Sequence, residues 1–314
     1  MLWRRPFHAA VAFTLLSAGF EASAFAYCRT STGGVKEGCA ITGTECCTIG
    51  LPIFWKNACV GYDIQQDASK QISYDQAAQA IALAFSKWTG AACPIDVHGS
   101  SRASIDVSDL GPVACNLVQY DKSGPNQNVI LFDDDVWPHQ DSSNALAITT
   151  VTFETTTGEL YGADMEINTA QQTLTVRDPI PPDGYDFASV VTHETGHFLG
   201  LAHSPDKSAT MYFKYLNGET SMRTLTQDDV DGICDIYPPS GDRSVADGGT
   251  VAEVACDPTP RHGFSSTCAP IDDNATSSGC SCDLAGTNDT SSPKFVGSMI
   301  ALGALVRKRR RRKI

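Results

Sequence analysis

The chain has 314 residues, of which 42% are hydrophobic, so it is long enough to bury the core of one sizeable domain or two small ones. Its formal net charge is −13, and the body is more acidic than this because many Lys and Arg residues lie near the two ends. An acidic body repels nucleic acid and anionic membrane surfaces, which argues against a nucleic-acid-binding protein.

Residues 1–26 have the pattern of a secretory signal peptide. Two arginines precede an apolar stretch, Ala9–Phe20, and the small residues Ala24 and Ala26 form an A-x-A cleavage pattern. A membrane anchor is the alternative interpretation, but the apolar stretch is short for a membrane span. We therefore predict an exported protein whose leader is removed after Ala26.

The 12 cysteines favour disulfides over metal clusters, because their number is even and the chain is predicted to be exported. The segment from Cys28 to Cys59 is rich in Cys, Gly and Thr, and it predicts a loop-rich region held by disulfides. Cys46 and Cys47 are adjacent, so each is expected to bridge to a different partner. The pairing stays open, since the spacing allows many connectivities.

The first predicted helix spans about Ser73–Trp88. Ser73 and Gln76 have the spacing of a capping box, in which each side chain bonds a backbone N–H at the start of the helix. Apolar residues recur at helical spacing along this segment, namely Ala77, Ile81, Ala84, Phe85 and Trp88. This pattern predicts a helix with one face packed on the core.

Strands and two further helices follow. Segments rich in Val, Ile, Thr and Phe predict strands at Asn128–Phe132, Ala145–Phe153 and Glu159–Ile167. A second helix is expected over about Asp186–Leu199, and a third begins near Thr226 and stops before the prolines at 238 and 239. The order of helix, strands, helix and helix predicts an α+β fold, with one domain over residues 27–239.

The composition changes after this domain. Residues 240–293 contain mainly Gly, Ser, Thr, Asp and Pro, and we predict a disordered linker in which Cys256 and Cys268 close a small loop. Residues 294–314 form a tail with an apolar part, Phe295–Val306, followed by a cluster of arginines. A short helix with a basic end is one interpretation, and a sorting or anchoring tail is the one that we favour.

The residues with catalytic chemistry lie in the second predicted helix. His193 and His197 are four residues apart, so both imidazoles project from the same helix face and can bind one tetrahedral ion. Gly200 tolerates a positive φ, so the chain can turn there and bring His203 to the same ion as a third ligand. The motif therefore predicts a catalytic Zn²⁺ site with Glu194 beside the first ligand.

Three neutral histidines would leave one position of a zinc ion open for water. Zinc lowers the pKa of a bound water from about 15.7 toward about 7. Glu194 could then take the proton of that water and deliver it to the leaving amine. A helix whose histidines are ordinary core or surface residues is the bland alternative, and the added Gly200 and His203 argue against it.

This pattern, together with Met211, is similar to the signature of the metzincin zinc proteases, in which the methionine packs beneath the metal. The resemblance extends to the matrixins (matrix metalloproteases) and covers roughly residues 50–238. It rests on three stretches besides the motif, namely Phe85–Trp88, His203–Tyr212 and Leu225–Tyr237.

The matrixin resemblance implies a mixed twisted sheet, an active-site helix, a C-terminal helix and zinc in the cleft. It implies that the Ala145–Phe153 strand is the sheet edge above the cleft, where a substrate adds as an antiparallel strand. Ala147 on that strand and Tyr215 near the pocket for the side chain after the cut are the implied substrate-binding residues.

The chain also departs from the matrixin pattern. The cysteine-switch motif of that family is not present, which puts the usual thiolate latency in doubt. His139 and Asp141 have the first spacing of a structural zinc site, but the following spacing is too short, so we interpret His139 as a loop residue. His98 and His262 have no partners at ligand spacing.

The tail resembles the myxobacterial C-terminal sorting signal. Cys280 and Cys282 form the cysteine motif, and the apolar segment and arginine cluster follow them. The resemblance implies display at the cell surface or processed release.

These observations predict a secreted or surface-displayed zinc-dependent metalloendopeptidase that acts on proteins or peptides. We expect a monomer, no nucleic-acid partner, and outer-surface membrane anchoring through the tail.

The acidic residues leave Ca²⁺ binding open, but a solvated surface is the simpler interpretation because no EF-hand spacing occurs. A non-catalytic surface adhesion protein on the same scaffold is the alternative, although Glu194 would serve no purpose there. A gluzincin hydrolase is a third option, with a downstream Glu in place of His203.

Overall fold

A computed structural model describes residues 27–33, 45–94, 99, 101–142, 144–270 and 298–304. The predicted signal peptide, residues 1–26, and the cysteines of the predicted sorting motif, Cys280 and Cys282, lie outside these residues, as does His98. Among the described residues, no helix has the length and apolar character needed to cross a membrane.

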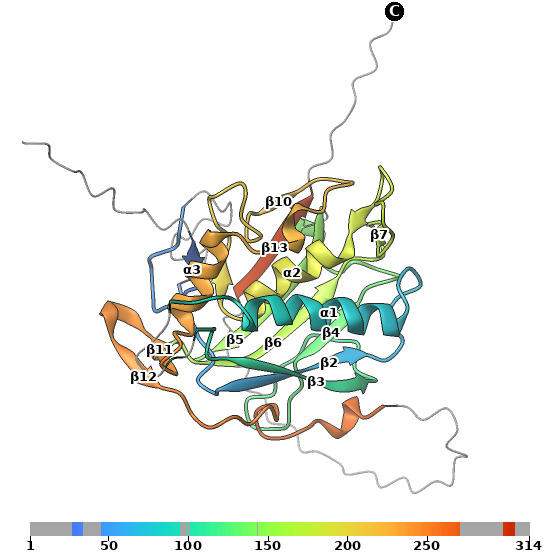
Figure 1. Cartoon of the computed structure of the whole chain (residues 1–314). Helices are drawn as coiled ribbons and strands as arrows, with labels where there is room; N and C mark the ends of the chain where they lie inside the picture. The colour runs from blue at the N-terminus through green and yellow to red at the C-terminus, as the bar shows by residue number, and fades with distance from the viewer. Residues whose placement is uncertain are drawn as a thin grey trace, which may run out of the picture.

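A seven-stranded mixed sheet forms the centre of the fold, with the order β10-β13-β5-β6-β4-β2-β3 (Figure 1). In chain order its strands are β2 (Cys59–Gln65), β3 (Asp106–Val113), β4 (Val129–Phe132), β5 (Ala145–Phe153), β6 (Leu160–Ile167), β10 (Lys214–Tyr215) and β13 (Ser298–Ala304). The five strands from β5 to β3 include one antiparallel pair, β5 with β6, and parallel pairs beyond it. The mixed sheet and its helices confirm the predicted α+β class.

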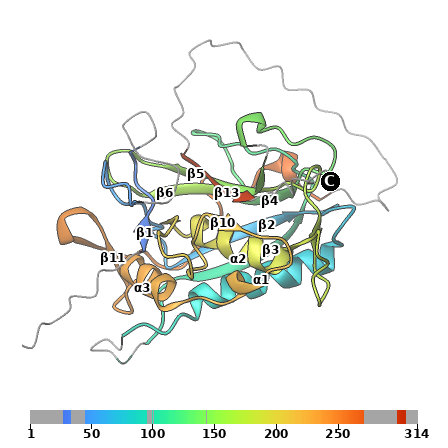
Figure 2. The ribbon, with the colours of Figure 1, turned by 90° about the horizontal axis from the view of Figure 1, so that it is seen from above.

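Two helices pack on one face of this sheet, α1 (Tyr74–Thr89) and α2 (Phe187–Phe198), as Figures 1 and 2 show. The capping box of Ser73 and Gln76 is present at the start of α1, and the five predicted apolar positions of this helix are buried. The predicted helix 73–88 is therefore confirmed, with a shift of one residue. A third helix, α3 (Gln227–Ile236), begins after Thr226 as predicted and ends before the prolines.

The helix α2, which carries His193 and His197, lies inside the protein. Asp186 caps its first turn by accepting from the N–H of Ser189 at 3.0 Å, and Arg223 bonds the same carboxylate at 2.7 Å. At the other end, the indole N–H of Trp55 donates to the carbonyl of Phe198 at 2.8 Å. Because both ends are held by buried partners, the position of α2 relative to the sheet is defined.

The smaller elements complete the fold. They are β1 (Cys28–Arg29) with β9 (Leu201–Ala202), β7 (Leu174–Thr175) with β8 (Tyr185–Asp186), and β11 (Asp242–Ser244) with β12 (Thr250–Ala252). The pairing of β1 with β9 attaches the N-terminal segment to the residues that follow the histidine helix.

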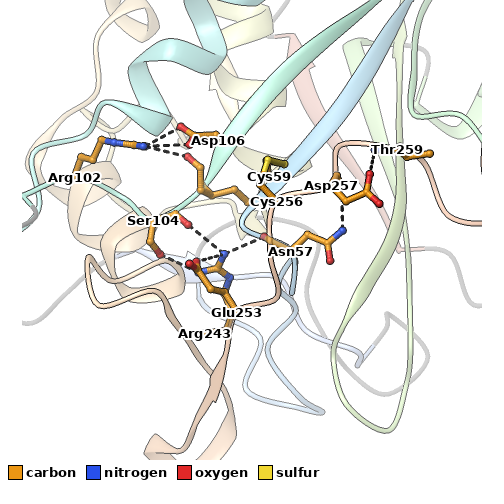
Figure 3. Close-up of a disulfide and its surroundings, with 11 residues drawn as sticks. Asn57, Cys59, Arg102, Ser104, Asp106, Arg243, Glu253, Cys256, Asp257 and Thr259 are labelled. Atoms are coloured by element: carbon orange, nitrogen blue, oxygen red, sulfur yellow. Dashed lines mark hydrogen bonds and ion pairs between the residues drawn. A yellow bond between two sulfur atoms is a disulfide. The ribbon is translucent and has the colours of Figure 1, made fainter.

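The predicted disordered linker is wrong for residues 240–270, which belong to the fold. β11 and β12 form a hairpin whose Arg243 is fully buried and donates to the carbonyls of Trp55 at 2.8 Å and Asn57 at 2.9 Å. Figure 3 shows this arginine reaching toward Ser104 and Asn57, near the Cys59–Cys256 disulfide. A polar segment is thus held by one buried cation and a covalent bond to β2, so it needs no apolar core of its own. The predicted boundaries at residues 26, 239 and 294 stay predictions.

The described disulfides join distant parts of the chain. They are Cys28–Cys46, Cys59–Cys256, Cys93–Cys234 and Cys115–Cys268. The predicted loop between Cys256 and Cys268 is therefore wrong, because each of these cysteines bridges to the body of the protein. Such long-range bridges stabilise mainly by restricting the unfolded chain.

Four strands of the central sheet were not predicted, and one of them, β10, has only two residues. β2 is buried along nearly its whole length, although its apolar residues Val60, Tyr62 and Ile64 alternate with Gly61, Asp63 and Gln65. β3 contains Gly111 and Pro112, which normally mark the end or the edge of a strand, and β3 does lie at the sheet edge. β13 lies in the apolar tail that we interpreted as a sorting or anchoring segment.

Candidate metal centre

The end of α2 brings the three predicted histidines together. His193 and His197 lie on one face of α2, and the helix ends after Phe198. Gly200 follows with a φ of 101°, in the left-handed region that favours glycine. A Cβ atom at this position would also lie 3.1 Å from the carbonyl oxygen of Ile53. The chain then enters β9, whose pairing with β1 sets the position of His203.

The nitrogens of these rings converge on one point. His193, His197 and His203 are all buried, and each offers a ring nitrogen within 4.8 Å of the others. The Nε2 atoms of His193 and His197 are 3.0 Å apart. Ligands in a tetrahedral zinc site, with Zn–N bonds of about 2.0–2.1 Å, lie about 3.3 Å apart. The spacing of this pair is close to that value.

Backbone carbonyls define which nitrogen of each ring carries the proton. The Nδ1 atom of His193 is 2.6 Å from the carbonyl oxygen of Thr210, and the Nδ1 atom of His197 is 2.8 Å from that of Leu201. A carbonyl can only accept, so both Nδ1 atoms are donors and both Nε2 atoms present lone pairs to the centre. Two lone pairs at 3.0 Å repel each other, and a cation between them removes that repulsion. The residues therefore fit a metal ion.

Burial keeps His193 and His197 neutral. It lowers the pKa of His193 to about 4, against a small opposing effect of the Thr210 carbonyl. The pKa of His197 lies well below its usual value, first because of burial and then because of the neighbouring His193 and His203. Neutral imidazole is the form that binds metal, so no proton has to be displaced near neutral pH.

Glu194 lies beside the first histidine with its carboxylate buried. The hydroxyl of Thr149 in β5 donates to Oε2 of Glu194 at 2.7 Å. Within the described part of the chain, no residue hydrogen-bonds Oε1. Burial raises the pKa of Glu194 to about 8, and the Thr149 hydroxyl acts in the opposite direction. One oxygen is thus oriented by the sheet and the other is available to a reacting group.

Met211 packs directly against α2. A Cβ atom at Gly196 would lie 2.4 Å from Sδ of Met211 and 2.8 Å from the indole of Trp88. Only glycine at this position lets the methionine approach the helix backbone between the two histidines of α2. Met211 therefore packs against α2 at the residue before His197, and its role beneath a metal ion stays a prediction.

Asp229 organises the turn that contains Met211, and sequence reasoning missed it. Its buried carboxylate accepts from the N–H groups of Thr210 at 2.8 Å and Met211 at 3.0 Å. It also closes a capping box with Thr226 at the start of α3. The signal was present, because Thr226 and Asp229 have capping-box spacing. The carbonyl of Thr210 in turn orients His193, so Asp229 is linked to the histidine cluster through the backbone of Thr210.

The two predicted substrate-binding residues lie on the two strands that flank β13. Ala147 is buried in β5, and Tyr215 is buried in β10, where its hydroxyl donates to the carbonyl of Glu219. Their role in substrate binding stays a prediction. β5 is the outer strand of the five strands from β5 to β3, and β13 adds to it as an antiparallel strand that lies between β5 and β10.

The two other histidines of the described residues, His139 and His262, take no part in this cluster. Nε2 of His139 lies 2.8 Å from the carboxylate of Glu166, so His139 pairs with an acidic residue of β6. His262 is near the surface, where its ring contacts the carbonyl of Gly124. Across the described residues, His193, His197 and His203 form the single group of three or more metal-binding side chains.

Comparison with known proteins places this site in a matched region. Residues 116–238 match the matrixin family model. Over 75 residues the chain is 45% identical to neutrophil collagenase from Homo sapiens, which covers 24% of this chain and 16% of that protein. It is 46% identical to matrilysin from Homo sapiens over 54 residues, 17% of this chain and 20% of that protein.

A plant protein is similar to the same degree. The chain is 49% identical over 55 residues to metalloendoproteinase 1-MMP from Arabidopsis thaliana, which covers 18% of this chain and 15% of that protein. The matched part thus spans about a fifth or less of the length of these relatives. The family model and the relatives support a matrixin-like catalytic domain, a metalloprotease class of activity and a catalytic zinc ion.

Proposed function

We propose that this protein is a zinc-dependent endopeptidase in which His193, His197 and His203 hold the metal and Glu194 is the general base. One observation carries the proposal: three buried imidazoles, two of them with Nδ1 held by carbonyls, converge beside a buried carboxylate. When bound, zinc supplies a Lewis acid that polarises a peptide carbonyl and makes water acidic near neutral pH.

The protein side chains perform the proton transfers. Glu194 takes a proton from the attacking water at the oxygen that Thr149 does not occupy, and the water oxygen then bonds to the peptide carbon. The same carboxyl group delivers that proton to the leaving nitrogen as the C–N bond breaks. Burial raises the pKa of Glu194 to about 8, which favours the protonated form of the carboxyl group. A nearby cation favours the charged form, which the base needs.

The competing functions make different demands on the site. A gluzincin would need a carboxylate as third ligand, but the cluster found among the described residues consists of three histidines. A non-catalytic adhesion protein would gain nothing from a buried carboxylate, whose desolvation is costly. Both considerations favour the endopeptidase.

Export and surface display belong to the proposal as well. The four long-range disulfides support an oxidising compartment, where such bonds form and persist. Protein or peptide substrates follow from the proposed chemistry, and the tail after residue 294 is the proposed sorting or anchoring element.

Substitution of the base tests the mechanism. Glu194→Ala should bind zinc with the same stoichiometry as the wild type and lose cleavage of a denatured protein, measured by metal analysis and gel assay. Persistent cleavage by this variant would show that the mechanism is wrong. His203→Ala should lose most of its zinc, and full retention of zinc would favour the gluzincin arrangement.

A further inference from the structure

A segment near the C-terminal end of the chain, β13, lies between β5 and β10. β13 pairs with β5 in antiparallel register, from Ser298 opposite Val151 to Gly303 opposite Ala145. On its other side β13 pairs with β10 in parallel register, with Ala304 opposite Tyr215. Figure 1 shows β13 in red between these two strands. The helix α2 lies in front of the sheet in this view.

Both neighbours of β13 belong to the candidate site. β5 carries Thr149, whose hydroxyl donates to Glu194 at 2.7 Å. β10 begins three residues after Met211, whose side chain packs under α2. An extended segment between β5 and β10 is therefore flanked on both sides by residues that position the proposed base and the metal ligands.

The backbone of β13 passes close to the proposed base. Ile300 is the residue opposite Thr149 in the antiparallel ladder. Opposite residues of such a ladder have Cα atoms about 4.5–5.5 Å apart. Thr149, whose hydroxyl donates to the Glu194 carboxylate, is thus a ladder neighbour of β13. Cα atoms of β13 and α2 also approach within 8 Å of each other.

The ladder changes partner near the predicted substrate residue Ala147. Between Ala301 and Gly303 the register with β5 shifts, so that an extra residue of β5 is left unpaired there. Gly303 then pairs with both β5 and β10. Bulges of this kind occur next to active sites and leave part of the ladder unbonded. A strand whose hydrogen-bond pairing is interrupted is more easily displaced than a strand with continuous pairing.

We propose that residues 298–304 are a ligand of the protein's own substrate cleft, held in the place of an extended peptide between β5 and β10. This inference rests on the proposed function, because it takes that cleft to be the substrate site. The segment has the sequence Ser-Met-Ile-Ala-Leu-Gly-Ala, without charge or proline, so each of its residues can adopt the extended conformation that strand addition requires. As part of the same chain it acts at an effective concentration on the order of millimolar.

A proline substitution in the full-length chain tests whether the segment competes with substrate. Ile300→Pro removes a backbone donor from the ladder, and Asp289→Pro, outside the strand, is the matched control. Ile300→Pro should lower KM for a peptide substrate by about tenfold with kcat unchanged, because an internal competitor raises the apparent KM. A synthetic peptide with the sequence of residues 298–304 should inhibit this variant competitively.

Two kinetic outcomes would overturn the inference. Equal KM values for Ile300→Pro and Asp289→Pro would show that the strand does not occupy the substrate site. A fall in kcat together with a lower melting temperature in Ile300→Pro would show that β13 is a permanent structural strand of the sheet.

Hydrogen exchange tests the occupancy without any need for catalysis. In the Glu194→Ala background, the β5 amides of Ala145–Phe153 should exchange slowly in the full-length chain and at least about tenfold faster after Ile300→Pro. Unchanged exchange would overturn the inference, and protection that grows with protein concentration would assign the occupant to a second molecule. If the protein cleaves no substrate, the proposed function is wrong. The exchange result would still show whether residues 298–304 cover β5.

Discussion

Replacement of Asp229 is the most informative single change, because this residue acts on the metal centre without touching it. Its carboxylate is 1% exposed and accepts from the N–H groups of Thr210, Met211 and Thr226 and from the Thr226 hydroxyl, at 2.8–3.0 Å. The Thr210 carbonyl accepts from Nδ1 of His193. Asp229→Ala should therefore lower both the free energy of unfolding and the affinity for zinc.

The size of each effect follows from these contacts. Hydrogen bonds to a charged group contribute about 1.5–3 kcal/mol each, and a buried donor left unpaired costs about 1–3 kcal/mol. The donors of Thr226 lie at the start of α3, where water can replace the carboxylate. The loss of stability in Asp229→Ala therefore comes mainly from the unpaired N–H groups of Thr210 and Met211. We expect a loss of about 3–5 kcal/mol in the free energy of unfolding. Loss of an outer partner of a metal-binding histidine weakens metal binding by about 10–100-fold.

Zinc titration against a competing chelator measures the affinity, and urea unfolding of the zinc-loaded protein measures the stability. Asp231→Ala is the matched control, because Asp231 lies on the same helix and bonds Gln227 at the surface. This control should change stability by less than about 0.5 kcal/mol. If Asp229→Ala is destabilised but binds zinc as tightly as the control, the proposed link through Thr210 to His193 is wrong.

Three further changes test other parts of the structure. Thr149→Val removes the hydroxyl that lowers the pKa of Glu194, so the acidic limb of the kcat–pH profile should move to higher pH, whereas Thr149→Ser should leave it in place. Gly196→Ala places a methyl group against Met211 and should lower stability by about 1–3 kcal/mol in thermal unfolding, with an unchanged melting temperature as the contrary result. Arg243→Ala leaves buried carbonyls without donors and should cost about 2–4 kcal/mol in urea, and no loss would mean that the 240–270 region does not stabilise the domain.

The metal centre was predictable because its geometry is local. Two histidines four residues apart share a helix face whatever surrounds the helix, and Gly200 allows the turn toward His203 within a few residues. The bounds of β5 were predicted to the residue for a similar reason, since its composition favours a strand and polar residues flank it.

The support of this centre depends on contacts between distant residues. Thr149 reaches Glu194 across 45 positions of the chain, and Asp229 reaches Thr210 across 19. A sequence shows that a threonine lies in a strand or that an aspartate caps a helix, but not which group each side chain meets. The capping-box pattern around Asp229 thus gave its local role and left its link to His193 unseen.

The composition of residues 240–270 led to the largest difference, and the composition of the apolar tail did not reveal its strand. Low apolar content predicted disorder after residue 239, yet a buried Arg243 and the bridges of Cys256 and Cys268 attach that region to the body. The apolar tail predicted an anchor, and residues 298–304 form a strand beside β5.

The sequence by itself determined the helices, three of the strands and the likeness of the histidine motif to a zinc-protease signature, because these features repeat or lie within a few residues of one another. Only the tertiary structure decided the neighbours of β5, the partners of the cysteines, the orientation of the base and the residue that supports the metal-centre turn. Each of those depends on which distant segments share an edge or an interior, and the free energy of such contacts is distributed over the whole fold.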